Sequence, residues 1–215
     1  MTTFHIITVL PNSFDGYLKQ SIIGRAIKAR KLKVKIYDLR DFVKADHAGR
    51  KTIDGRSYGG GPGMVLMAGP ILRAAAKIKR LGGRQKIILL AAGGKQFTND
   101  LARLWVDRYD HIILIAGRYE GVDDRARRIL KAEEISIGPY ILTGGELPAL
   151  VLIDALARQA AGVLGNPDSL EEDRVASARV YTRPEVLTHA GKNHRVPKIL
   201  LSGHHAKIEE WRGKQ

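Results

Sequence analysis

The stretch HIILIAGRYEGVDDRARRILKAEEISIGPYILTGGE, residues 111–146, decides the fold that the sequence predicts. It begins with an apolar run, 111–117, whose length and branching are typical of a buried strand. A glycine-flanked turn at 117–121, a charged helical segment and a short strand at 133–137 follow, before a second glycine-rich turn at 140–146. An α/β protein binds ligands at such turns, where parallel strands end at the edge of the sheet.

The rest of the N-terminal three quarters alternates strands with helices. Further strands are predicted at 4–10, 33–39 and 86–90, and helices at 13–30, 70–81, 98–108 and 147–165. This alternation predicts an α/β fold with a mostly parallel sheet covered on both faces. The last helix is apolar nearly all round, which is typical of a deep core or a subunit interface. Its one arginine, Arg158, either pairs with an acid or faces an active site.

The overall charge is unusual for a folded chain of 215 residues. Lys and Arg number 36 against 22 Asp and Glu, a net charge of +14. Such an excess favours a polyanionic partner, most often nucleic acid, over a generally basic protein without one. There is no cysteine, no apolar run that could span a bilayer, and no basic and apolar leader at the N-terminus, so we expect a cytoplasmic protein without membrane contact.

Positive charge gathers in two segments. Residues 19–35 hold seven basic side chains and no acid (Lys19, Arg25, Lys28, Arg30, Lys31, Lys33 and Lys35), either a solvated face or a track for phosphates. Residues 179–215 carry eight basic residues against three acids, interleaved with aromatic residues and histidines, a composition that suits RNA contact.

Three other segments hold residue types that are found in binding or catalytic sites. The run YGGGPGMVLM, 58–67, is either a hinge or, as we favour, a binding wall that lets backbone approach a ligand. The polar segment 163–178 is interpreted as a linker, although its acids could supply a general base. A loose group of acids and a histidine fits no defined ligand spacing, so no metal site is predicted from Asp41, Asp46, His47 and Asp54.

Several motifs together resemble one family. They are SIIGRA (21–26), RDF (40–42), YGGGPGM (58–64), GRYEGVDDR (117–125), EEISIG (133–138), YILTGGELPAL (140–150), GVLGN (162–166), YTRPEVL (181–187) and LLSGHHAKIEEWR (200–212). In this order and spacing they resemble the bacterial tRNA (guanine-N(1)-)-methyltransferases of the SPOUT class, over essentially the whole chain. A single glycine loop would be weak evidence, but the ordered set is specific.

The resemblance implies a fold and an activity. The fold is an α/β domain with a deep trefoil knot, here 1–162, a linker at 163–178, and a small, shortened helical domain that binds tRNA, 179–215. The activity is transfer of a methyl group from S-adenosylmethionine to N1 of the guanosine immediately 3′ of the anticodon, position 37 of tRNA. Members work as homodimers whose active sites are shared between subunits, and they use magnesium, for which the sequence shows no ligand set.

The resemblance also assigns site residues. Asp173 would remove the proton from the guanine ring nitrogen, with Glu171 and Glu172 as competing candidates, and Arg158 would stabilise negative charge on the guanine oxygen. The cofactor would be held by three segments and a strand end: Tyr58, Gly59, Gly60 and Pro62; Ala91 and Ala92; Gly117, Arg118, Tyr119, Glu120 and Gly121; and Ser136, Ile137, Gly138, Tyr140, Leu142, Gly144 and Gly145.

Some positions depart from the family pattern. Pro139 stands where relatives usually have aspartate, Ala92 replaces a proline, Arg174 and Val175 follow Asp173, and many relatives continue beyond Trp211–Gln215. Two rival hypotheses therefore stay open. One is a related knotted methyltransferase that acts on another RNA base, and the other is a non-catalytic tRNA- or cofactor-binding protein.

Overall fold

The computed structural model describes residues 2–164 and 179–214. The chain divides into two compact units, 1–165 and 166–215. Nearly all of the linker expected at 163–178 lies outside the described residues. No helix of the described chain is long and apolar enough to cross a membrane.

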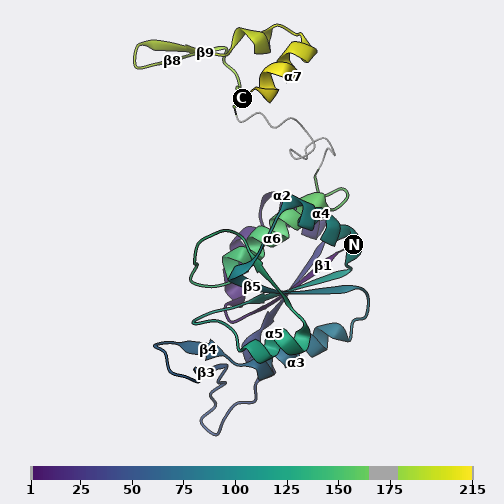
Figure 1. The fold of residues 1–215 in the computed structure, drawn as a ribbon. Coiled ribbons are helices and arrows are strands. Elements are labelled where there is room, and N and C mark those ends of the chain that lie inside the picture. Colours follow the sequence, from purple (N-terminus) through teal and green to yellow (C-terminus); the bar gives the residue numbers. More distant parts are fainter. Residues whose placement is uncertain (1, 165–178, 215) are drawn as a thin grey trace. The chain divides into compact units, whose positions relative to one another are not determined.

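A five-stranded parallel sheet forms the centre of the first unit (Figure 1). Its strands are β1 (Thr3–Thr8), β2 (Lys33–Asp38), β5 (Gln85–Gln96), β6 (His111–Ala116) and β7 (Glu133–Ser136). They lie in the order β2-β1-β6-β5-β7, and every pair is parallel. The expected α/β class and mostly parallel sheet are therefore confirmed.

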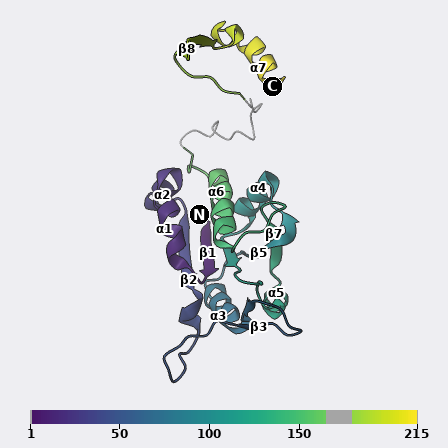
Figure 2. The same cartoon turned by 90° about the vertical axis from the view of Figure 1, so that its left-hand side faces the viewer.

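Helices cover both faces of this sheet (Figures 1 and 2). One face carries α1 (Asp15–Leu18), α2 (Ser21–Lys28), α4 (Asn99–Arg108) and α6 (Glu146–Gln159). The other face carries α3 (Ala68–Lys79) and α5 (Asp124–Leu130). α4 begins as expected, because the Thr98 side chain accepts a hydrogen bond from Leu101 N.

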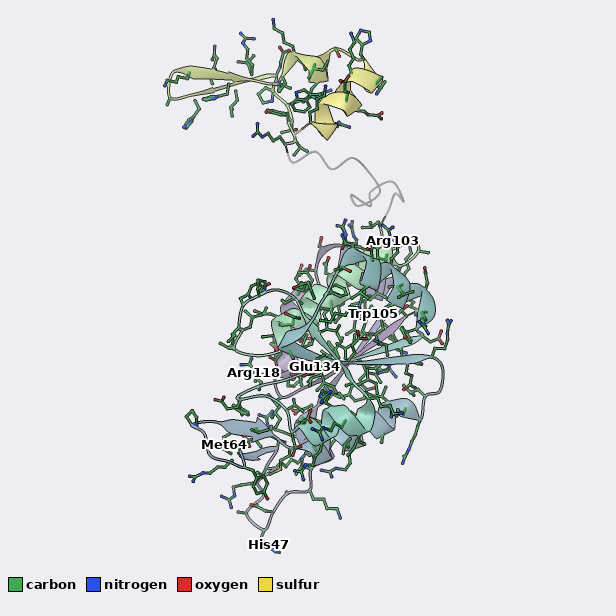
Figure 3. The ribbon with its side chains drawn as sticks, in the orientation of Figure 1. His47, Met64, Arg103, Trp105, Arg118 and Glu134 are labelled. Carbon is green, nitrogen blue, oxygen red and sulfur yellow. The ribbon has the colours of Figure 1, made fainter. Side chains whose placement is uncertain are left out.

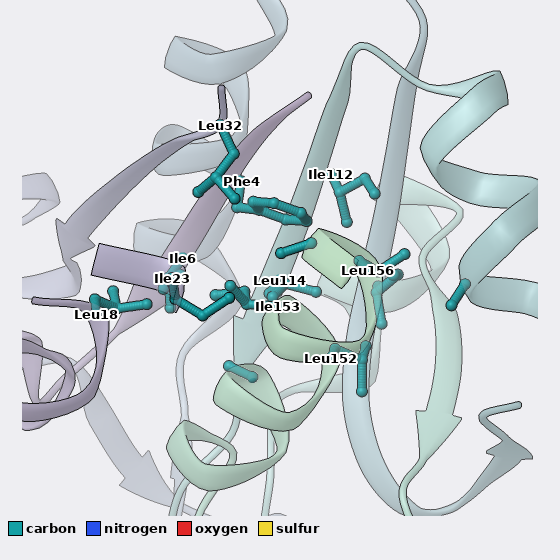
Figure 4. Close-up of a cluster of buried hydrophobic side chains, with 14 of the residues drawn as sticks. Phe4, Ile6, Leu18, Ile23, Leu32, Ile112, Leu114, Leu152, Ile153 and Leu156 are labelled. Carbon is teal, nitrogen blue, oxygen red and sulfur yellow. The ribbon is translucent and has the colours of Figure 1, made fainter. Parts of the chain in front are cut away.

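The hydrophobic core is split by the sheet into two clusters. In β6, Ile112 and Leu114 face α6, whereas Ile113 and Ile115 face α3 and α5. Figure 4 shows the first cluster, in which Leu152, Ile153 and Leu156 of α6 pack with strand side chains. Because β6 is buried on both faces, its sequence is one continuous apolar run.

Two predicted elements differ from the structure in more than their bounds. The helix expected at 13–30 is divided into a 3₁₀ turn (Pro11–Phe14), α1 and α2, and the Ser13 hydroxyl donates to Leu10 O at 2.6 Å instead of capping a helix. The turn expected at 91–94 lies within β5, which continues with a register shift between Leu90 and Lys95. A side chain at Gly94 would come within 2.5 Å of the Glu134 backbone, so a close approach of two strands requires this glycine.

Two hairpins were missed by the sequence analysis. β3 (Asp54–Arg56) pairs antiparallel with β4 (Met64–Leu66), and the turn between them holds the glycine run. In the second unit, β8 (Val186–His189) pairs antiparallel with β9 (Lys192–Arg195), followed by a 3₁₀ turn (Lys198–Leu201) and α7 (His205–Gly213). The small helical segment expected here therefore holds a hairpin as well as its helices.

Candidate functional site

A cavity of about 370 Å³ opens where β6 and β7 end, over the middle of β5. Its volume falls within the range of small-molecule and cofactor sites, about 300–1,000 Å³. Of the residues assigned to the cofactor from the sequence, those that line it are Ala91, Ala92, Gly117, Arg118, Tyr119, Glu120, Gly121, Ser136, Ile137, Gly138, Tyr140, Leu142, Gly144 and Gly145. The two glycine-rich turns that decide the fold thus meet at one cavity.

The tip of the third glycine segment does not line this cavity. Tyr58, Gly59, Gly60 and Pro62 lie in the β3–β4 turn, and the Tyr58 side chain is 99% exposed. The base of the same hairpin does contact the site, because Glu120 N donates to Met64 O and Leu66 N donates to Gly121 O, both at 3.0 Å. Figure 3 labels Met64 on this hairpin.

Sequence reasoning missed six lining residues, which are Leu89, Leu90, Val122, Glu134, Ile135 and Pro148. Ile141 and Thr143 also line the cavity and lie within the wall expected at 136–145. Most of the six missed residues flank a glycine turn or end a strand, so adjacency in the sequence was the signal that could have found them. Glu134 is different because it comes from within β7. It is the second acidic residue that lines the cavity, in addition to Glu120, and Figure 3 labels it together with Arg118.

The two glycine-rich turns are in direct backbone contact. Gly145 N donates to Gly117 O at 2.9 Å, and an isolated bridge pairs Arg118 with Gly144. A Cβ at Gly145 would lie 2.6 Å from the Cα of Ala116, which is closer than side chains approach backbone. The 117–121 turn also places Gly121 at φ +120°, a region that favours glycine. Glycine is therefore required at 145 by the approach of the two turns and favoured at 121 by the backbone conformation.

A tight turn after β7 forms the remaining wall. Gly138 N donates to the Ser136 hydroxyl at 3.2 Å, and that hydroxyl donates to Gly138 O at 2.9 Å. The Tyr140 ring folds back so far that a Cβ at Gly138 would lie 2.3 Å from it, and its hydroxyl donates to Ile137 O at 3.3 Å. These bonds hold a tyrosine ring, half exposed, at the mouth of the cavity.

Of the two residues expected to be catalytic, Arg158 alone lies in the described chain. Arg158 is half-buried in the last turn of α6 and does not line the cavity. It follows Glu146, at the cavity end of α6, by twelve residues, or about 18 Å along the helix axis. Asp173, Glu171 and Glu172 lie outside the described residues.

Within the loose acidic group at 41–54, Asp46 is engaged locally. The Asp46 carboxylate accepts Arg50 N at 2.8 Å and Ala48 N at 2.9 Å, and it contacts Arg50 Nε at 3.0 Å. These bonds, first of all the one from the Arg50 backbone, hold the pKa of Asp46 below its ordinary value. Within 2–164 and 179–214, no three His, Cys, Asp or Glu side chains gather in a way that could hold a metal ion.

Comparison with known proteins identifies the family. Residues 2–215 match the family described as tRNA (Guanine-1)-methyltransferase TrmD. A tRNA (guanine-N(1)-)-methyltransferase of Thermomicrobium roseum is 45% identical over 216 residues, covering 97% of this chain and 76% of its own. Relatives of the same name are 42% identical in Pseudoalteromonas atlantica, over 99% and 79% of the two chains, and 41% identical in Dictyoglomus turgidum, over 100% and 85%.

The chain belongs to the tRNA (guanine-N(1)-)-methyltransferase family. The resemblance drawn from the motifs is thereby confirmed. Membership in a methyltransferase family implies an S-adenosylmethionine cofactor. The cavity fits such a molecule chemically, because glycine turns expose backbone amides and carbonyls while Leu90, Ile135 and Leu142 give apolar surface.

Proposed function

We propose that this protein transfers a methyl group from S-adenosylmethionine to N1 of the guanosine immediately 3′ of the anticodon, position 37 of tRNA. The observation that carries the proposal is the family match over residues 2–215, with curated relatives named tRNA (guanine-N(1)-)-methyltransferase. The net charge of +14 supports a polyanionic substrate. The proposal implies work in the cytoplasm, where tRNA is available.

The cofactor would occupy the cavity between the two glycine-rich turns. When bound, S-adenosylmethionine supplies a methyl group activated by its positively charged sulfur. The turns at 117–121 and 136–145 would orient it through backbone groups, and Glu120 and Glu134 would place negative charge near a cation. The exposed tip at 58–62 does not line the cavity, so its assignment to the cofactor remains a proposal that requires movement of the β3–β4 hairpin.

Two side chains would act on the guanine. Asp173 would accept the proton from N1 as that nitrogen attacks the methyl carbon, and Arg158 would stabilise negative charge that develops on the guanine oxygen. Both roles come from the resemblance. Removal of the proton is the step that needs help, because the N1–H of guanine is a weak acid at neutral pH.

A homodimer would bring Arg158 of one subunit to the cavity of the other. Arg158 is about 18 Å along α6 from the cavity end, so within one chain it is remote from the cofactor. On the same helix, Leu147 is 61% exposed and Val151 46% exposed, which is typical of an interface. We therefore propose that the active site forms between the cavity of one subunit and Arg158 of another.

The trefoil knot and magnesium also belong to this proposal. The knot is supported by the return of the chain after the edge strand β7 to the end of β6, where Gly145 N bonds Gly117 O. Magnesium dependence follows from the resemblance. Assay with and without a chelator, at constant ionic strength, tests it.

The decisive experiment is methyl transfer from labelled S-adenosylmethionine to a tRNA transcript with guanosine at position 37. Wild type should methylate this transcript and not one with adenosine at that position, and Asp173→Ala should lower kcat at least a hundredfold, the effect of a general base. Glu171→Ala and Glu172→Ala are matched controls and should keep most activity. Equal methylation of both transcripts would refute the assigned position, and full activity of Asp173→Ala would move the base to another carboxylate.

A further inference from the structure

We infer that Glu146 is a positioning residue for the cavity, because its buried carboxylate holds Arg118 away from the space that the cofactor would occupy. This inference rests on the proposed function. Glu146 is the first residue of α6 and is only 4% exposed. It does not line the cavity, whereas Arg118 does. Any effect of Glu146 on ligand binding therefore passes through its neighbours.

The two carboxylate oxygens of Glu146 have separate partners. Oε1 accepts a hydrogen bond from the Thr8 hydroxyl at 2.8 Å, and Oε2 accepts one from Arg118 Nε at 3.0 Å. Thr8 ends β1, so the first bond ties Glu146 to the end of a strand of the sheet. Among the described residues, no buried side-chain nitrogen or oxygen lacks a partner, which includes this carboxylate.

The Arg118 guanidinium is held at two points. Besides the bond to Glu146, its Nη1 donates to Thr143 O at 3.2 Å. The pair sits directly over Gly144, where a Cβ would lie 2.4 Å from Arg118 Nε and 2.6 Å from Glu146 Oε2. The ion pair with Glu146 and the bond to Thr143 O thus join the 117–121 turn to the 140–146 turn. Only a residue without a side chain at 144 leaves room for the ion pair.

The charge of Arg118 makes this arrangement important for ligand binding. A long cation on the cavity wall can either point into the cavity or lie against the wall, and the carboxylate selects the second position. If the carboxylate is removed, the guanidinium keeps its charge and loses its fixed partner. It is then free to enter the cavity, where it repels a positively charged sulfur more than a neutral one. Glu146 would therefore favour S-adenosylmethionine over its neutral product, S-adenosylhomocysteine.

The test is calorimetric titration of the full chain with each of these two ligands. Glu146→Gln keeps the size of the side chain and removes its charge. We expect this variant to weaken the binding of S-adenosylmethionine at least tenfold. The ratio of its Kd to that of S-adenosylhomocysteine should rise at least threefold. Thr8→Val is the matched control, because it removes the other bond of Glu146 and leaves the ion pair. It should lower Tm while changing the ratio of Kd values less than twofold.

Two further variants keep the inference falsifiable. Arg118→Lys, which keeps the charge and cannot make both of the arginine contacts, should shift the ratio in the same direction even if Glu146→Gln fails to fold. Arg118→Met/Glu146→Gln has no cation to release and should show the wild-type ratio, although both ligands bind more weakly. A wild-type ratio in folded Glu146→Gln or in Arg118→Lys would overturn the inference. Failure of wild type to bind either ligand would instead overturn the proposed function.

Discussion

The buried histidine His5 should make the stability of the protein depend on pH below 7. His5 lies in β1 and is fully buried. Its Nδ1 is 3.0 Å from the Tyr37 hydroxyl and its Nε2 is 3.0 Å from His111 Nδ1. Burial, followed by the charges of His111 and Lys35, lowers its pKa from 6.5 to about 4. The folded protein therefore holds this imidazole neutral at a pH where the unfolded chain protonates it.

The sign and size of the effect follow from proton linkage. Between pH 6.5 and about 4 the unfolded state binds the extra proton, so the stabilisation that is complete above pH 6.5 is lost as the pH falls. For pKa values of 6.5 and about 4, lowering the pH from 7 to 5 costs about 2 kcal/mol of unfolding free energy. That is a large share of the 5–15 kcal/mol typical of a domain.

Urea unfolding at pH 7, 6 and 5, at one protein concentration, measures this dependence. His5→Gln retains an amide that can hydrogen bond and cannot titrate, so it should be less stable at pH 7 and lose about 2 kcal/mol less than wild type between pH 7 and 5. His47→Gln is the control, because His47 is exposed in the 43–53 loop and its replacement should leave the wild-type dependence unchanged. Parallel curves for wild type and His5→Gln would refute the reasoning.

Three other predictions concern RNA, cofactor and stability. Four basic residues are exposed and could form a phosphate track: Lys28, Arg30, Lys31 and Lys33. If they do, changing all four to glutamine should weaken tRNA binding and reduce the slope of log K against log salt concentration by about 3 units. An unchanged slope would exclude the track. Gly145→Ala should weaken S-adenosylhomocysteine binding more than tenfold in titration, whereas Gly16→Ala, with nothing within 4 Å of the added carbon, should bind normally. Thr98→Ala should remove the α4 cap and cost about 1 kcal/mol in urea unfolding, with ligand affinity unchanged. A loss well below that value would mean that water or a neighbour replaces the cap.

The sheet could be predicted from the sequence because its strands carry their own signal. β6 is buried on both faces from Ile112 to Ala116, so these residues are all apolar, and a glycine turn marks its end. β5 shows the limit of such reasoning. Its second half contains Gly93 and Gly94, which predict a turn, yet it stays extended because Lys95 and Gln96 pair with Ile135 and Ser136 of β7. A partner strand forty residues away decides that conformation.

The sequence predicted the parts of the site that glycine-rich turns form. It did not predict the parts that depend on contacts between residues far apart in the chain. The turns at 117–121 and 138–145 were found because glycine is frequent where backbones approach closely. Glu146 was missed as a functional residue, since an acid at the start of an apolar helix is expected there for any helix. Its partner Thr8 is 138 positions away in the chain, and no local pattern reports that contact. The tip at 58–62 was assigned to the cavity from its glycines, and only the structure shows that Tyr58 is exposed.

The glycine-rich walls of the cavity also affect how readily mutations could make the protein resistant to an inhibitor. Resistance usually arises when a new side chain blocks a compound while the natural ligand still fits. At Gly138, Gly144 and Gly145 an added carbon would collide with the protein itself, at 2.3, 2.4 and 2.6 Å. A compound that forms hydrogen bonds with the backbone of these turns would therefore bind residues that can hardly be substituted without distorting the turns. Escape would have to come from side chains at the rim such as Ile141, which lines the cavity and is exposed.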